Sequence, residues 1–272
     1  IIITGGAGVC GSALLNLNYE KIFIDRINKP KLFKRIDYLK TELNKLKKIE
    51  KVINKNDILI HLAATDYYPD FKMGSKDTSI KSYNENNIII TKALFDLCIK
   101  KNVNKVIFAS STRVQGMYEK IYSKSIYNLK KNIKFDHNSP LCPDSYYAVT
   151  KIYGENLANF YSSNYETIFK CIRIGSVRSI QDDHPHAYAN YGIKNGLWKK
   201  NSKLYNFQKY RLMGIWQSRR DFLHLVNQII LTKNNEFEIY YGLSDNSRKW
   251  FNLNYTKKSL KYKSQDNSEN FK

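Results

Sequence analysis

Residues 1–12, Ile1-Ile2-Ile3-Thr4-Gly5-Gly6-Ala7-Gly8-Val9-Cys10-Gly11-Ser12, decide the fold class of this 272-residue chain. A short β-branched run ends abruptly in a glycine-rich turn, and the helix-compatible residues 13–15 follow. Gly5, Gly8 and Gly11 give the spacing G-x-x-G-x-x-G. Because these residues carry no Cβ, backbone N–H groups of the turn can approach a pyrophosphate closely. The segment therefore predicts a strand, a dinucleotide-binding turn and a helix.

An acidic residue follows at the distance that such a turn requires. Asp25 lies 20 residues after Gly5, at the end of the apolar run 21–25. A carboxylate there can accept hydrogen bonds from both ribose hydroxyls of adenosine and repels a 2′-phosphate. The neighbouring Arg26 weakens this preference, because a guanidinium could accept that phosphate. The pair still favours NAD over NADP.

Apolar runs typical of buried strands recur along the first 174 residues, at 57–62, 105–109 and 168–174. Helices are expected between the strands, at about 39–50, 84–102 and 145–163, and a weakly marked strand is expected near 33–36. Alternating strands and helices predict an α/β fold, a Rossmann-like doubly wound parallel sheet.

The regular alternation of predicted strands and helices ends after Ile174. A connection rich in Gly, Ser, Asp, His and Pro, near 175–190, precedes a helix expected at 220–232, a strand at 237–243 and a helix near 251–259. This part looks too irregular to continue the winding. We therefore expect an NAD-binding Rossmann domain over 1–174 and a small substrate-binding C-terminal lobe over 175–272, which does not fold independently. The polar tail from about Lys263 is expected to fray.

The net charge is +21, from 45 Lys and Arg against 24 Asp and Glu. A surplus of this size could attract nucleic acid, anionic lipid or phosphorylated substrates. The excess Lys is scattered through segments rich in Asn, Ile and Tyr, which indicates a general bias in residue usage and not one basic patch. Nucleic acid is therefore not expected as a partner.

The four cysteines, at 10, 98, 142 and 171, form no CxxC or Cys/His spacing, so no metal site is expected. Dispersed cysteines fit a reducing, cytoplasmic compartment. No apolar run approaches the roughly 18 residues of a membrane span, and the start of the chain lacks the pattern of a signal peptide. The sequence thus predicts a cytoplasmic protein that is not embedded in a membrane.

Three side chains predict a site for proton abstraction. Tyr147 and Lys151 stand four residues apart on a predicted helix and share one face, whereas Tyr146 has no such partner. An ammonium beside a phenol stabilises the phenolate and lowers the pKa of the phenol from about 10, as a general base requires. Ser111 follows the strand at 106–109, at the carboxyl end where wound sheets bind ligands, and its hydroxyl can orient an alcohol.

With these pieces the sequence resembles the extended short-chain dehydrogenase/reductase family, the NAD-dependent epimerase/dehydratase group. The matching motifs run in the family's order over about 175 residues. They are Thr4–Gly11, Asp25, His61-Leu62-Ala63-Ala64, Asn87 in Asn-Ile-Ile-Ile-Thr, Ser111, Pro143-x-x-x-Tyr147-x-x-x-Lys151 and Arg173-Ile174-Gly175-Ser176.

The resemblance implies an enzyme with NAD as cofactor and with Ser111, Tyr147 and Lys151 as the catalytic trio. Asp37 and Tyr38 would lie beside the adenine. His61 is expected to be a packed structural histidine, and Asn87 could also be structural, as a buried amide that satisfies backbone groups. The implied cofactor contacts are Gly5, Gly8, Val9, Gly11, Asp25, Arg26, Asp37, Tyr38, Leu62, Ala63, Ala64, Asn87, Tyr147, Lys151 and Ile174.

The C-terminal part is more loosely similar to uronate dehydrogenases, which oxidise the C1 hydroxyl of a hexuronic acid to a lactone with NAD. The similarity implies Arg211 as a bidentate clamp for the sugar carboxylate and Ser176 as a hydrogen-bond partner of the sugar. It rests on Arg173-Ile174-Gly175-Ser176, Arg211-x-Met213-x-x-Trp216, Asp221-Phe222 and Tyr241-Gly242-x-Ser244-Asp245-Asn246-x-x-x-Trp250.

The sequence departs from this subfamily in the substrate region. Thr112 and Arg113 replace the usual Asn-His, and they also differ from the acidic pair of 4,6-dehydratases, so dehydration is not expected. Asp66 replaces a serine, and extra residues occupy about 117–135 and 180–205. Asp66 would repel a carboxylate, whereas Arg113 would attract a carboxylate or a phosphate. Thr112, Arg113 and Asp66 therefore join Ser111, Ser176 and Arg211 as expected substrate contacts.

Two alternatives stay open beside a sugar dehydrogenase. One is an NAD-dependent nucleotide-sugar 4-epimerase or reductase, in which the substrate's diphosphate meets the basic lobe. The other is a non-catalytic module that senses dinucleotides or binds RNA, which the trio in register disfavours. The oligomeric state stays open as well; relatives in the family often form homodimers through the helix that carries Tyr147 and Lys151 and its neighbour.

Overall fold

The computed structural model describes residues 1–65, 85–131 and 133–271. A seven-stranded sheet has the order β3-β2-β1-β4-β5-β6-β7, and every neighbouring pair is parallel. This order confirms the predicted Rossmann-like doubly wound sheet. The strands are β1 (Ile2–Thr4), β2 (Ile22–Asp25), β3 (Asp37–Lys40), β4 (Ile58–His61), β5 (Lys105–Ser111), β6 (Ile168–Ile174) and β7 (Glu238–Gly242).

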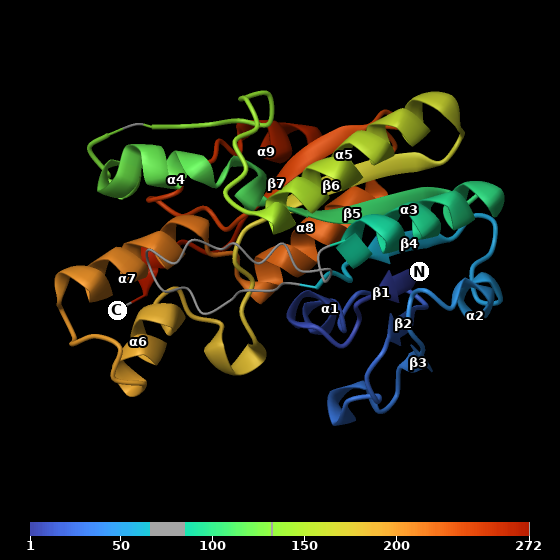
Figure 1. Cartoon of the computed structure of the whole chain (residues 1–272), viewed down its shortest axis with the longest axis horizontal. Coiled ribbons are helices and arrows are strands. Elements are labelled where there is room, and N and C mark those ends of the chain that lie inside the picture. Colours follow the sequence, from blue (N-terminus) through green and yellow to red (C-terminus); the bar gives the residue numbers. More distant parts are fainter. Residues whose placement is uncertain (66–84, 132, 272) are drawn as a thin grey trace.

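Helices cover both faces of the sheet (Figure 1). On one face, α3 (Glu85–Lys100) and α5 (Tyr146–Asn164) lie side by side, with α2 (Leu46–Glu50) next to α3. On the other face lie α1 (Val9–Ala13), α8 (Arg219–Leu231) and α9 (Asn254–Leu260). The helices α4 (Met117–Tyr122), α6 (Ala187–Lys194) and α7 (Lys203–Ile215) gather beyond the carboxyl ends of the strands. Short 3-10 turns are η1 (Lys31–Phe33), η2 (Thr112–Gln115), η3 (Ser123–Tyr127), η4 (Ile180–Asp182) and η5 (Ser268–Asn270).

Successive residues of each central strand enter two separate cores. Ile3, in β1, packs with α1 and α8, whereas its neighbour Ile2 packs on the side of α3 and α5. Ile60 and Leu59 of β4 divide in the same way. Because both sides of these strands are covered, their apolar residues stand at consecutive positions and not at alternate ones.

The winding continues beyond Ile174, contrary to expectation. β7 pairs in parallel with β6, and α8 crosses between them on the α1 face. The spacing of Phe222, Leu225, Val226 and Ile229 buries one stripe of α8 against the sheet. Residues 219–242 are therefore part of the wound layers, and the division of the chain at 174/175 stays a prediction.

Two predicted elements differ from the structure, the strand near 33–36 and the helix at about 39–50. Phe33 lies in η1, where its ring packs against Phe23 at 5.0 Å between ring centroids. The strand itself is β3, at 37–40, and the helix expected over 39–50 is reduced to α2. The apolar residues near 33–36 therefore cap the core and do not pair in the sheet.

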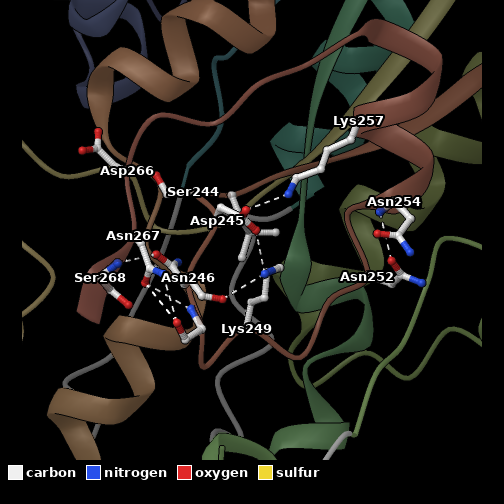
Figure 2. A network of polar contacts seen from close by, with 12 residues as sticks. Ser244, Asp245, Asn246, Lys249, Asn252, Asn254, Lys257, Asp266, Asn267 and Ser268 are labelled. Carbon is white, nitrogen blue, oxygen red and sulfur yellow. Dashed lines mark hydrogen bonds and ion pairs between the residues drawn. The ribbon is translucent and has the colours of Figure 1, made fainter. Parts of the chain in front are cut away.

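The polar tail after Lys263 is held in place and is not frayed, which corrects the expectation. The carboxylate of the buried Asp221 accepts hydrogen bonds from the N–H groups of Gln265 at 2.7 Å and Asp266 at 3.2 Å. Asn246 Oδ1 accepts a bond from the N–H of the fully buried Ser268 at 3.0 Å (Figure 2). The polar residues that suggested disorder are the donors and acceptors that fix the tail.

Candidate active site

A cavity of about 1140 Å³ opens at the carboxyl ends of the central strands. It joins the glycine-rich turn, the ends of β2, β4, β5 and β6, and residues of α5 and α7. The predicted site residues that line it are Gly5, Gly8, Val9, Asp25, Arg26, Leu62, Ala63, Ala64, Asn87, Ser111, Thr112, Arg113, Tyr147, Lys151, Ile174, Ser176 and Arg211. The structure thus brings most of the expected residues to one place, while Asp66 lies outside the described residues.

The glycine-rich turn is packed so closely that side chains would not fit. Gly5 has φ +69°, and a Cβ on it would lie 2.6 Å from the backbone nitrogen of Ala63. A Cβ on Gly11 would lie 2.2 Å from the carbonyl oxygen of Gly6. Gly11 is not among the cavity-lining residues, so its part is to let α1 approach the turn, whereas Gly5 and Gly8 face the ligand space.

Asp25 ends β2 beside this turn. Its Oδ2 accepts a hydrogen bond from the N–H of Ala7 at 3.0 Å, and its Oδ1 is 3.4 Å from the N–H of Ile27. The carboxylate is thereby held at the cavity wall, next to Arg26. A tight backbone turn together with a fixed carboxylate fits the diphosphate and adenosine ribose of NAD.

Asp37 is not where the resemblance implied. It begins β3 opposite Ile22, at the amino end of the strands, whereas the cavity lies at the carboxyl end. Tyr38 donates a hydrogen bond to the Ile27 carbonyl at 3.0 Å, and burial together with Asp25 raises its pKa to about 12, so its hydroxyl stays protonated. The cavity is lined instead by residues 41–44, which follow β3. Placing that strand correctly would have found them.

Lys151 and Tyr147 meet on the buried side of α5. The Lys151 Nζ donates to the Ala109 carbonyl at 2.8 Å and lies 5.5 Å from the centroid of the Tyr147 ring. Lys151 is only 3% exposed, so its ammonium acts in a region of low dielectric. Ser111, at the end of β5, is also buried, and its Oγ accepts a bond from the N–H of Arg113 at 3.2 Å.

A buried network that the sequence reading missed supports this helix. Glu155 follows Lys151 by four residues, on the same face. Its carboxylate accepts bonds from Arg173 Nε and Nη2, each at 2.9 Å, and from Ser110 Oγ at 2.6 Å. The ion pair joins α5 to β6 below the cavity. The spacing 147, 151, 155 was the signal that could have revealed it.

His61 and Asn87 serve the structure, as expected for the histidine. The His61 ring is buried, with Nδ1 2.7 Å from Thr4 Oγ1, and burial with the nearby Lys151 lowers its pKa to about 3. Asn87 holds the chain after β4: its Oδ1 accepts from the Thr65 N–H at 2.8 Å and its Nδ2 donates to the Thr65 carbonyl at 3.2 Å. Asn87 also lines the cavity.

At the substrate end, the cavity is lined by Arg113 and Arg211 and by Ser176 and Thr112, which are each held by a hydrogen bond to a backbone carbonyl. Arg211 comes from α7 and Arg113 from η2, and both side chains are mostly buried. Ser176 is fixed through its N–H, which donates to the Ile215 carbonyl at 2.7 Å. Thr112 Oγ1 donates to the Ile174 carbonyl at 3.3 Å. Guanidinium groups at this end can bind a carboxylate or a phosphate.

Arg219, at the start of α8, ties the glycine-rich turn to the C-terminal part of the chain. Its Nη1 donates to the carbonyls of Val9 at 3.3 Å and Arg178 at 3.2 Å, and its Nη2 donates to Ser12 Oγ at 3.1 Å. Its N–H donates to Asp183 Oδ2 at 3.0 Å. Val9 and Ser12 lie 210 and 207 positions from Arg219, so no local sequence pattern indicates these two contacts.

We expect Arg219→Gln to weaken NAD binding by about tenfold, because the turn loses donors that hold it in the binding geometry. Calorimetric titration with NAD measures the change in Kd. Arg220→Gln is the matched control, since Arg220 is more than half exposed and pairs with Asp266 in the tail. Equal affinities of the Arg219 and Arg220 variants would contradict this role.

Within the described parts of the chain, no helix is both long and apolar enough to cross a membrane. The same residues contain no cluster of three or more His, Cys, Asp or Glu side chains suited to hold a metal ion.

Comparisons with known proteins identify a family model and several relatives that this chain is similar to. The model of the NAD-dependent epimerase/dehydratase family matches residues 1–229. The uronate dehydrogenase of Pseudomonas syringae pv. tomato is 31% identical over 179 residues, which cover 66% of this chain and 51% of that protein. The NAD-dependent glucose-6-phosphate dehydrogenase of Haloferax volcanii is 27% identical over 280 residues, covering 100% and 95%. The chain thus spans about half the length of the first relative and nearly all of the second.

Solved structures share the fold. A glucuronic acid dehydrogenase from Chromohalobacter salexigens superimposes with a TM-score of 0.72 at 23% identity, covering 98% of this chain and 85% of that one. A UDP-glucuronic acid 4-epimerase from Bacillus cereus, solved in complex with NAD, gives 0.68 at 19% identity, covering 99% and 95%. Because one family model matches most of the chain, and the turn and Asp25 fit the cofactor, the protein belongs to the NAD-dependent epimerase/dehydratase family of enzymes.

Proposed function

We propose that the protein oxidises a hydroxyl of a sugar with NAD, at C1 of a hexuronic acid or a related sugar, and forms a lactone. The observation that carries the proposal is the position of Lys151 between the Ala109 carbonyl and the Tyr147 ring, in a cavity that also contains Ser111 and the glycine-rich turn. An acid–base pair beside a dinucleotide site is the arrangement that alcohol oxidation requires.

When bound, NAD supplies a nicotinamide ring that accepts the hydride from the reacting carbon. Tyr147, as a phenolate, takes the proton of the sugar hydroxyl, and the Lys151 ammonium stabilises the phenolate until then. Ser111 orients the hydroxyl toward Tyr147. The glycine-rich turn and Asp25 hold the adenosine diphosphate part, while Leu62, Ala63 and Ala64 line the dinucleotide.

Arg211, Arg113 and Ser176 are proposed to bind the far end of the sugar. A planar guanidinium binds a carboxylate through two parallel hydrogen bonds, and both arginines line the cavity. The relatives support an anionic sugar, since uronate and glucose 6-phosphate both carry an acidic group at C6.

A second candidate is an NAD-dependent nucleotide-sugar 4-epimerase or reductase. Arg178 lines the same cavity as Arg113 and Arg211, so a diphosphate could meet several guanidinium groups there. A putative UDP-glucose 4-epimerase of Methanocaldococcus jannaschii is 24% identical over 199 residues. Such an enzyme would retain NAD through purification and show no net reduction of the cofactor.

Absorbance at 340 nm tests the proposal, with NAD and a panel of free uronic acids, neutral aldoses and nucleotide sugars. Formation of NADH with glucuronate or galacturonate is the expected result. No NADH from any free sugar, with conversion of a nucleotide sugar instead, would replace the dehydrogenase by the second candidate.

A cytoplasmic location and a homodimer stay predictions. Apolar side chains on α5, one of the helices expected to pair, support the dimer: Val149 and Phe160 are 42% and 56% exposed. Uncovered apolar side chains on such a helix are typical of an interface between subunits.

A further inference from the structure

Two carboxylates face the two arginines at the substrate end of the cavity. Arg211 Nε donates to Glu119 Oε1 at 2.6 Å, and Arg113 Nη1 lies 3.9 Å from Glu119 Oε2. Arg113 Nε lies 2.9 Å from Asp144 Oδ2. The formal charges of the four groups cancel, and it is the arginines that line the cavity.

These four side chains are shielded from solvent. The exposed fractions are 15% for Arg113, 19% for Arg211, 13% for Glu119 and 2% for Asp144. Charges in such surroundings interact more strongly than in water and are screened less by salt. The charge of Glu119 therefore affects an anion that binds at Arg211.

Glu119 comes from the extra residues at 117–135, which distinguish this sequence from the uronate dehydrogenase pattern. It lies on α4, and the buried Tyr127 of the same stretch donates to Glu119 Oε1 at 2.5 Å. Two donors, Tyr127 and Arg211, thus converge on one carboxylate oxygen. The inserted stretch supplies both the acid and the group that holds it against the arginine.

We propose that Glu119 is a specificity-determining residue, which shares Arg211 and Arg113 with the substrate and limits the preference of the site for carboxylate-bearing over neutral sugars. The inference rests on the proposed function and deepens it. A sugar carboxylate at Arg211 has to share the guanidinium with a like charge, whereas a neutral sugar does not. Removing the Glu119 charge should favour the acidic sugar.

The test compares glucuronate with glucose, which differ only in the carboxylate or CH₂OH group at C6. Calorimetry on protein loaded with NADH gives Kd for both sugars without turnover, because NADH cannot accept a hydride. Glu119→Gln should lower the ratio of the glucuronate Kd to the glucose Kd by about tenfold or more. With NAD, the ratio of kcat/KM for glucuronate to kcat/KM for glucose should rise by the same factor.

A control variant separates the loss of the Glu119 charge at this site from a general change in net charge. Glu50→Gln makes the same change in net charge at the Lys100 pair on α2. Its Kd ratio should stay within about twofold of wild type. Asp144→Asn removes the second carboxylate and should shift the ratio in the same direction as Glu119→Gln, so the test does not depend on one variant folding.

An unchanged ratio in Glu119→Gln, an equal shift in a control, or no binding of either sugar to any variant would overturn the inference. A shifted ratio in a protein that binds the sugars but produces no NADH would support it, and would reject only the proposed dehydrogenase activity.

Discussion

Tyr147→Phe is expected to lower kcat for sugar oxidation by about 10³-fold, the range of a lost general base. The phenylalanine keeps the ring beside Lys151 but has no oxygen to take the proton of the substrate hydroxyl. The affinity for NAD should not change, since the turn and Asp25 are untouched. Initial rates at 340 nm give kcat, and calorimetry gives the NAD Kd.

Tyr146→Phe is the matched control, because Tyr146 is the adjacent residue of α5 and its side chain is exposed. Its kcat should equal that of the wild type. A Tyr147→Phe protein that keeps more than a tenth of wild-type kcat would remove Tyr147 from the role of base.

Glu155→Ala is expected to lower the free energy of unfolding by about 3–5 kcal/mol, the cost of breaking a buried ion pair. Arg173 is 2% exposed, so its guanidinium would be left in the interior without the carboxylate that accepts two of its bonds. The pKa of Arg173 is raised chiefly by that hydrogen-bonded carboxylate, against the effect of burial. Urea denaturation followed by circular dichroism measures the loss.

Glu50→Ala provides the comparison, since it breaks the exposed pair with Lys100, which is screened by water, and should cost far less stability than Glu155→Ala. Glu155→Gln keeps the shape and one acceptor, so its loss should lie between the two. If Glu155→Ala and Glu50→Ala unfold at the same urea concentration, the buried pair does not stabilise the fold.

Local patterns predicted the parts of the fold in which propensity and burial agree. The glycine-rich turn, β5 and α5 lie where their residues indicated, because each combines one periodicity with clear end signals. The prediction of β3 was wrong, since none of its four residues is fully buried and the nearby buried Phe33 looks more like a strand residue. β7 was found, but its place in the sheet depends on pairing with β6, which no local pattern encodes.

The residues of the candidate site also fall into two groups, those that local spacing predicts and those that it does not. Tyr147, Lys151 and Asp25 follow from spacing within one helix or one strand–turn–helix unit. The contacts of Glu119 with Arg211 and of Arg219 with Val9 could not be predicted, because they join residues 92 and 210 positions apart. Contacts of that kind exist only after the layers have assembled, so the sequence alone does not specify them.

The segment that holds Asp221, and Arg219 close to Asp221, are synthesised long after the glycine-rich turn. At about 5–20 residues per second, the helix of Arg219 and the segment 265–268 leave the ribosome roughly 10–50 s after the glycine-rich turn. Until β7 follows, β6 is an edge strand with unpaired backbone groups, open to another chain. During synthesis, each chain therefore passes through a period in which β6 is exposed at the edge of the sheet. The risk of aggregation is highest in this period.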